Sequence, residues 1–144
     1  VSMLEVHLEA VRDLLGGGGA EAPSLEVHTG GRVPGLTLRA VRTPGEVLEA
    51  LQEGAGRRST AATGMNEHSS RSHSILSVHV TAPSPSGPGG KGVRAARRGS
   101  LHLVDLAGSE RVARSGVSGQ GLKEAQAINK SLSALGDVVS ALKR

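Results

Sequence analysis

The pattern of apolar and polar residues predicts where strands form. In the segment SMLEVHLEAVRDLL, apolar and polar positions alternate from Met3 to Leu8, so we expect a strand that runs into a short turn ending in leucines. In the segment ILSVHV, Leu76, Val78 and Val80 share one face. The run SLHLVDL is almost entirely apolar, which is typical of a strand buried on both faces. These last two are the best-defined strands of the chain.

Two segments carry helix signals. Thr43, Pro44 and Glu46 form a capping box with proline at the first helical position, and glycines at 54 and 56 are expected to end this helix. Near the chain end, apolar residues recur every three or four positions and predict a long amphipathic helix. They are Leu122, Ala125, Ile128, Leu132, Leu135, Val139 and Leu142. This pattern meets no stop signal, so a truncated chain is expected.

Glycine, proline and serine mark the connections. The stretch GGGGAEAPS predicts a flexible break. Two short strand candidates flank Gly30 and Gly31, which together predict a hairpin. The stretch TAPSPSGPGGKGVRAARRG is rich in proline and glycine and then becomes basic, so we interpret it as a long, mobile surface connection.

Composition limits the fold and the partners. The 144 residues are 37% hydrophobic but include no aromatic residue, so one domain with an aliphatic core of modest stability is expected. The absence of cysteine excludes disulfides and thiolate metal sites. No apolar run could cross a bilayer and no signal segment is present, so a soluble intracellular protein is the simplest interpretation. The net charge of +4 suits an acidic partner, or simply a soluble basic protein.

A crowded polar stretch stands directly before the ILSVHV strand. The segment NEHSSRSH places Ser69, Ser70, Arg71, Ser72 and His73 on a loop at the mouth of that strand. Such residues also form ordinary turns, because their side chains bond to nearby backbone groups. Alone, this loop leaves a structural and a functional interpretation open.

The segment LVDLAGSE adds a second polar cluster. Asp105 ends an apolar strand and Gly108 follows three residues later. Nucleotide hydrolases hold magnesium with an acidic residue so placed. A glycine also lets a backbone amide approach a phosphate. The spacing by itself is common and usually structural, but next to a serine-rich loop it favours a phosphate and magnesium site.

Three motifs resemble one protein family. NEHSSRSH and DLAGSE are similar to switch I and switch II of the kinesin motor domain, and INKSLSALGDV resembles the start of the helix after switch II. The resemblance spans Val1 to Arg144. It implies the central part of a kinesin-type P-loop NTPase, an α/β fold with a mixed sheet flanked by helices and incomplete at both ends. Switch I would cover about 66–73, switch II about 105–110 and the microtubule-facing helix about 122–143.

The segment EAQAINKSLSALGDV, with Gln126, is similar to kinesins whose motor lies at the C-terminus and moves toward the microtubule minus end. The match is looser at His7 and Leu8, where the family usually has an aromatic and a polar residue. Cargo, direction of movement and oligomeric state lie outside what the sequence determines.

The resemblance implies roles for the residues that bind nucleotide and metal. Ser70 would ligate Mg²⁺, Asp105 would hold it through water, and Ser69 would close on the terminal phosphate of ATP. Gly108 would sense that phosphate through its amide. Arg58 stands where the family has an arginine near the nucleotide, although a solvated helix end explains it almost as well.

The resemblance also implies two coupling elements. Arg71 and Glu110 would form an ion pair that joins the switches and positions the attacking water. A basic helix and the loop before it would dock on the acidic face of tubulin, unless their charges are only a solvated surface. The residues concerned are Arg111, Arg114, Lys123, Asn129 and Lys130.

The chain contains no phosphate loop of the form GxxxxGK[ST], since GPGGKGV and GVSGQGLK lack both the spacing and the final Ser or Thr. The main interpretation is an ATP-driven microtubule motor of the cytoplasm and cytoskeleton, with this chain alone inactive. It would have no nucleic-acid partner and no membrane span. The alternative is a microtubule-binding module that has lost nucleotide chemistry. His28, His79 and His102 lack a metal-ligand spacing and receive no role.

Overall fold

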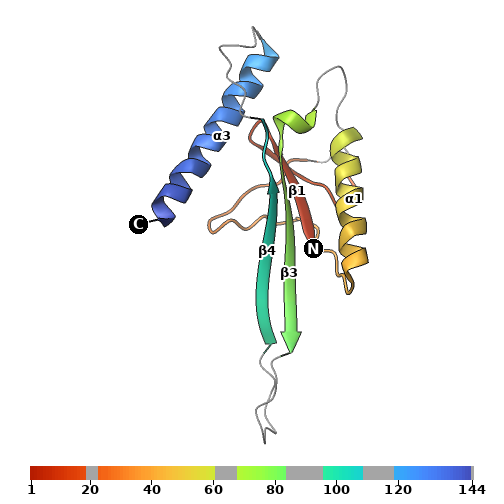
Figure 1. Cartoon of the computed structure of the whole chain (residues 1–144). Coiled ribbons are helices and arrows are strands. Elements are labelled where there is room, and N and C mark those ends of the chain that lie inside the picture. Colours follow the sequence, from red (N-terminus) through yellow and green to blue (C-terminus); the bar gives the residue numbers. More distant parts are fainter. Residues whose placement is uncertain (19–22, 61–67, 84–95, 109–118, 144) are drawn as a thin grey trace, which may run out of the picture.

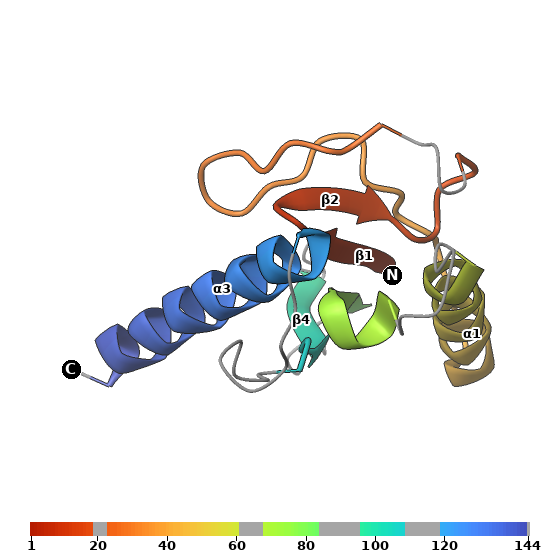
Figure 2. The same ribbon diagram turned by 90° about the horizontal axis from the view of Figure 1, so that it is seen from above.

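The computed structural model describes residues 1–18, 23–60, 68–83, 96–108 and 119–143. The elements within these ranges are β1 (Ser2–His7), β2 (Ala10–Asp13), α1 (Pro44–Thr60), the 3-10 helix η2 (His68–Arg71), β3 (His73–Pro83), β4 (Ala96–Asp105) and α3 (Gln120–Leu142). The strands form one sheet in the order β2-β1-β3-β4, and each of these neighbouring pairs is antiparallel. Helices α1 and α3 lie on opposite sides of it (Figures 1 and 2). The predicted sheet flanked by helices is confirmed.

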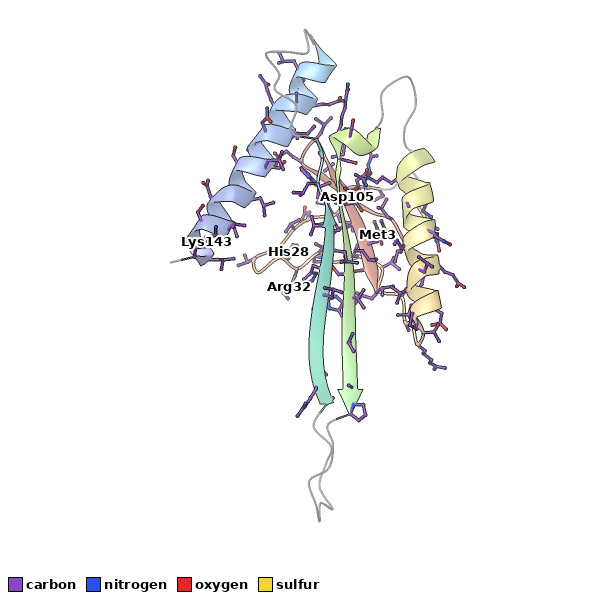
Figure 3. The ribbon with its side chains drawn as sticks, in the orientation of Figure 1. Met3, His28, Arg32, Asp105 and Lys143 are labelled. Atoms are coloured by element: carbon purple, nitrogen blue, oxygen red, sulfur yellow. The ribbon has the colours of Figure 1, made fainter. Side chains whose placement is uncertain are left out.

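The hydrophobic core lies between the sheet and α1. Its buried members are Val1, Met3, Leu14, Leu15, Ala50 and Leu76. Met3 projects from β1 toward α1 (Figure 3). A Cβ atom added to Gly54 of α1 would clash with the Met3 sulfur, so Gly54 permits the close approach of helix and strand.

Helix α1 begins as predicted but ends later. The Glu46 amide donates to Thr43 Oγ1 (3.2 Å), and Glu46 Oε2 accepts from the backbone amide of Arg42 (2.6 Å). The expected end at the glycines is wrong, because α1 continues to Thr60. Packing against the sheet outweighs the cost of about 1 kcal/mol for a glycine in a helix. The extra turn carries Arg58 to the sheet.

A hairpin replaces the leucine-ended turn that the sequence predicts after β1. Leu8 and Glu9 adopt left-handed backbone angles, with φ of 50° and 67°, and form a two-residue turn into β2. Asp13 at the end of β2 then accepts hydrogen bonds from the amides of Leu15 (2.8 Å) and Thr37 (2.7 Å). These bonds fix the segments that follow β2.

The predicted hairpin around Gly30 and Gly31 is only partly correct. Both glycines have positive φ, and the turn is closed by a bridge between His28 and Arg32, which Figure 3 labels. No strand extends from this bridge in the described residues. Val27 nearby is 61% exposed, so the apolar positions here have no sheet to cover.

Strands β3 and β4 form a long ribbon that projects from the rest of the molecule (Figure 1). Both strands were predicted, but the expected burial of β4 on both faces is wrong: all ten of its residues are exposed. The strand lies at the edge of the sheet in this structure. The predicted mobile connection at 81–99 is wrong at both ends, because residues 81–83 belong to β3 and residues 96–99 belong to β4, which pairs with it. Its middle, 84–95, lies outside the described residues, as does the middle of the glycine-rich break at 19–22.

Helix α3 confirms the predicted amphipathic helix. Its buried residues are Glu124 and Ile128, while its second half is largely exposed. Within the described ranges, none of the helices combines the length and apolar character that a membrane crossing requires.

Candidate functional site

The two polar motifs meet where β3 begins and β4 ends. Ser74 pairs with Asp105 in the antiparallel register, so the η2 turn before β3 lies beside the segment after β4. The amide of Gly108 donates to the carbonyl of Ser70 at 2.9 Å. The structure therefore brings together the NEHSSRSH and LVDLAGSE segments, which lie far apart in the sequence.

Arg58 enters this junction from the end of α1. Its Nη1 donates to Asp105 Oδ2 (2.6 Å), Nη2 donates to the Ser72 carbonyl (2.8 Å) and Nε donates to Ser72 Oγ (3.2 Å). Glu5 of β1, which is 1% exposed, places Oε1 3.7 Å from Arg58 Nε. Arg58 is itself 8% exposed, so the interpretation as a solvated helix end is wrong. Its role near a nucleotide stays a prediction.

Ser70 and Asp105 fit the chemistry of a magnesium site. Magnesium prefers oxygen ligands and keeps several waters, so it needs few protein ligands. Asp105, labelled in Figure 3, ends β4, and its side chain is 70% exposed, so a hydrated ion can reach it. Ser70 is half-buried on the facing turn. The side chain of Ser69 lies outside the described residues.

Arg71 contacts helix α3. Its Nη1 donates to Glu124 Oε2, and the two side chains are 26% and 11% exposed. Glu110, the partner that the sequence suggests, lies outside the described residues, so that ion pair stays a prediction.

His73 also contacts α3. Its Nδ1 accepts from the Ala107 amide (3.0 Å), and its Nε2 lies 2.8 Å from Ser131 Oγ. Burial, followed by the positive charge of Arg58, lowers the pKa of His73 below the ordinary 6.5, although Asp105 acts in the opposite direction. The imidazole is therefore neutral near pH 7.

Sequence reasoning gave no role to Glu124, Ser131 or His73. Glu124 stands four residues before Ile128, on the apolar stripe of the helix. A charged residue on such a stripe signals a buried partner, because an isolated buried charge is costly. No comparable signal marks Ser131.

The basic residues of α3 are only partly described. Lys123 and Lys130 are exposed and stand seven residues apart, which places them on one helix face. Lys130 Nζ lies 3.2 Å from Glu9 Oε1, while Asn129 is half-buried. Arg111 and Arg114 lie outside the described residues.

Comparisons with known proteins point to one family. The kinesin motor domain family matches residues 1–144. Kinesin-like protein KIN-14D of Oryza sativa subsp. japonica is 47% identical over 148 residues, which cover 99% of this chain and 14% of that protein. Kinesin-like protein KIN-14J of Arabidopsis thaliana is 48% identical over 146 residues, with 99% and 13% covered.

A solved structure agrees with these relatives. A KIF14 dimer, described as a two-heads-bound state with AMP-PNP in complex with a microtubule, is 39% identical and superposes with a TM-score of 0.76. The match covers 98% of this chain and 40% of that one. The chain thus spans only a small part of the curated relatives, 14% and 13% of their lengths.

Proposed function

The chain belongs to the kinesin motor domain family, and on this premise we propose that it forms the nucleotide-sensing and microtubule-facing part of an ATP-driven microtubule motor. The family predicted from the switch motifs is confirmed, and the KIN-14 relatives agree with the expected C-terminal-motor type. The observation that carries the proposal is the hydrogen bond between Gly108 and Ser70, which joins the two switch motifs.

This hydrogen bond gives the site two possible states. The Gly108 amide donates to the Ser70 carbonyl here, so it can bind a phosphate oxygen only by leaving that carbonyl. Such an exchange of acceptors moves one switch relative to the other. Gly108 would then report the terminal phosphate of ATP, as its position in the DLAGSE motif suggests.

Magnesium, when bound, would neutralise charge on the phosphates. Ser70 and Asp105 would hold it, with Asp105 acting through water. Arg58 orients Asp105 for this task through its 2.6 Å contact. Ser69 would close on the terminal phosphate.

Arg71 would change partners during the cycle. It pairs with Glu124 in this structure, so an ion pair with Glu110 requires that it release α3. The pair of Arg71 with Glu110 would position the attacking water. Loss of the contact between Arg71 and Glu124 would free the helix. This links hydrolysis to the orientation of α3.

The tubulin-facing surface would lie on α3 and the segment before it. Lys123 and Lys130 share an exposed face, and a helix face of this charge suits an acidic protein surface. Asn129, Arg111 and Arg114 complete the proposed set. The related KIF14 dimer is described in complex with a microtubule, which supports microtubules as the partner. The motor would act on cytoplasmic microtubules of the cytoskeleton, while this chain alone, which contains no GxxxxGK[ST] loop, would not turn over ATP.

A nucleotide-dependent affinity for microtubules tests the proposal. The full-length protein should co-sediment with microtubules at least about tenfold more tightly with Mg²⁺ and AMP-PNP than with ADP, a typical coupling between two sites. Gly108→Ala, which crowds the amide, should reduce this difference. Equal affinity in the two nucleotides would overturn the motor proposal and favour the non-catalytic microtubule-binding module, which the comparisons do not favour.

A further inference from the structure

We propose that His73 is a positioning residue that couples the segment after Asp105 to helix α3. Its imidazole bonds to Ala107 on one side and to Ser131 on the other. A shift of the switch II segment would thereby change the position of the tubulin-facing helix. This inference rests on the proposed function, because that function supplies the two sites to be coupled.

The directions of the hydrogen bonds around His73 are fixed by their partners. The Ala107 backbone N–H is a donor only, so Nδ1 must be the acceptor. A neutral imidazole then carries its proton on Nε2 and donates it to Ser131 Oγ, which in turn donates to the Ile128 carbonyl at 2.8 Å. Four groups in series thus connect β4's end to the backbone of α3.

The position of His73 makes this connection firm. The residue is 8% exposed and its bond to the Ala107 amide is buried, so solvent cannot readily replace that bond. Protonation would place an N–H of the ring against the Ala107 N–H, and the lowered pKa of His73 agrees with the neutral form. Nδ1 and Nε2 belong to one rigid ring. If Ala107 moves and the ring follows it, the hydrogen bond from Nε2 to Ser131 changes direction.

Helix α3 is held mainly by polar contacts, which suits a part that must move. Ile128 is its one buried apolar residue within the described ranges. A partly open pocket of about 70 Å³ lies at the contact, and its lining includes Leu8, His73, Ala127 and Ile128. Apolar packing therefore holds α3 only loosely, and the polar contacts of His73, Arg71 and Glu9 set the orientation of the helix.

We call the series from the Ala107 amide through His73 and Ser131 to the Ile128 carbonyl the relay. Two conservative variants, His73→Asn and His73→Gln, test its two ends separately. Asn in place of His73 keeps an acceptor near Nδ1 but does not reach Ser131, while Gln keeps a donor near Nε2 but loses the Ala107 contact. Each variant, and Ser131→Ala, should lower the microtubule activation of ATP turnover in the full-length protein about 5- to 20-fold, the range of ordinary site coupling. Activation is the ratio of turnover at saturating microtubules to turnover without them.

The matched control is His79→Asn. His79 also bonds through Nδ1 to a serine, Ser100 Oγ at 2.9 Å, but it lies exposed on the β3–β4 ribbon. Its activation ratio should equal that of the unchanged protein. A fall in melting temperature of the His73 variants with an unchanged ratio would reduce the residue to a structural role. Full activation in either His73→Asn or His73→Gln would show that one contact suffices, and would overturn the proposed coupling through His73.

Hydrogen exchange of residues 120–131 supplies a readout that does not depend on turnover. Adding Mg²⁺ and AMP-PNP to the full-length protein should change exchange in this segment, and the change should be lost in His73→Asn and Ser131→Ala. If the unchanged protein shows this response without microtubule activation, the motor proposal fails and the relay survives. If it shows no response, the relay is wrong.

Discussion

The buried guanidinium of Arg58 lies 2.6 Å from the carboxylate of Asp105. The two side chains differ in exposure, at 10% for Arg58 and 70% for Asp105. Arg58 is also held by Ser72 and lies close to Glu5, so it is the fixed member and Asp105 the accessible one. The end of α1 thereby determines where the acidic residue of the site stands.

Arg58→Ala should destabilise the protein by about 3 kcal/mol, because it removes a buried guanidinium that lies 3.7 Å from the buried Glu5 carboxylate and that donates to Ser72. Urea unfolding measures this change. The control is Arg39→Ala, whose pair with Glu53 is about one-third exposed and should matter much less. Equal losses in the two variants would show that the Arg58 cluster contributes no more than a surface ion pair.

Two glycines of α1 should respond in opposite directions to alanine. Gly54→Ala should destabilise the protein by about 1–2 kcal/mol, since its Cβ would clash with the buried Met3 sulfur and the core would have to repack. Gly56→Ala meets no atom within 4 Å and should stabilise it by about 0.5–1 kcal/mol through better helix propensity. Thermal unfolding of both variants tests this. Stabilisation by both would mean that the contact of α1 with β1 adjusts freely.

Asp13 should make stability depend on pH in acid. Burial raises its pKa, but hydrogen bonds from Thr37, Leu15 and Gly16 outweigh burial and hold the pKa below the ordinary 3.8. The resulting stability is present above pH 3.8 and is lost as the pH falls through the lower, folded-state pKa. At pH 6, Asp13→Asn should cost on the order of 2 kcal/mol, as expected for hydrogen bonds to a charged group.

This cost should shrink as the pH is lowered past 3.8 in urea unfolding of both proteins. Asp137→Asn, which changes an exposed carboxylate on α3, serves as the control. A cost of Asp13→Asn that stays constant from pH 6 to pH 2.5 would contradict the assignment.

Lys130→Ala and Lys123→Ala should each weaken microtubule binding of the full-length protein by about 3- to 5-fold at low salt, and less at high salt, where exposed charges are screened. The control is Lys143→Ala, which removes the same charge beyond the end of α3 (Figure 3). Co-sedimentation over a salt series distinguishes the outcomes. An equal loss of microtubule affinity in Lys143→Ala would indicate that net charge attracts the protein, and not that one face of α3 contacts tubulin.

Local patterns predicted the elements that depend on local signals. The capping box at Thr43, the strand through Leu76 and the helix through Ile128 all have periodicity or caps that favour one structure. The hairpin into β2 was missed because Leu8 and Glu9 are not turn residues, and only the pairing of the strands holds them at positive φ.

Features set by distant residues could not be predicted. β4 is exposed because β3 is the element that it mainly contacts, and the length of α1 depends on packing against Met3. In the candidate site, too, residue types could be predicted from the sequence but contacts could not. Its motifs were recognisable by residue type, but the contact between Arg71 and Glu124 joins residues 53 positions apart and follows only from the fold.

Microtubule-stimulated ATP turnover of the full-length protein and of its Arg71 and Glu110 variants tests the motor mechanism most directly. The unchanged protein should turn over ATP faster with microtubules. Arg71→Ala and Glu110→Ala should each reduce this rate by roughly 100-fold or more, as when a positioned catalytic group is removed, while ATP still binds. The double variant should be little worse than either single one, because paired residues act as a unit. If the losses of the two single variants multiply in the double variant, Arg71 and Glu110 do not act as a pair. Microtubule binding without any ATP turnover in the unchanged protein would contradict the proposal that it is a motor.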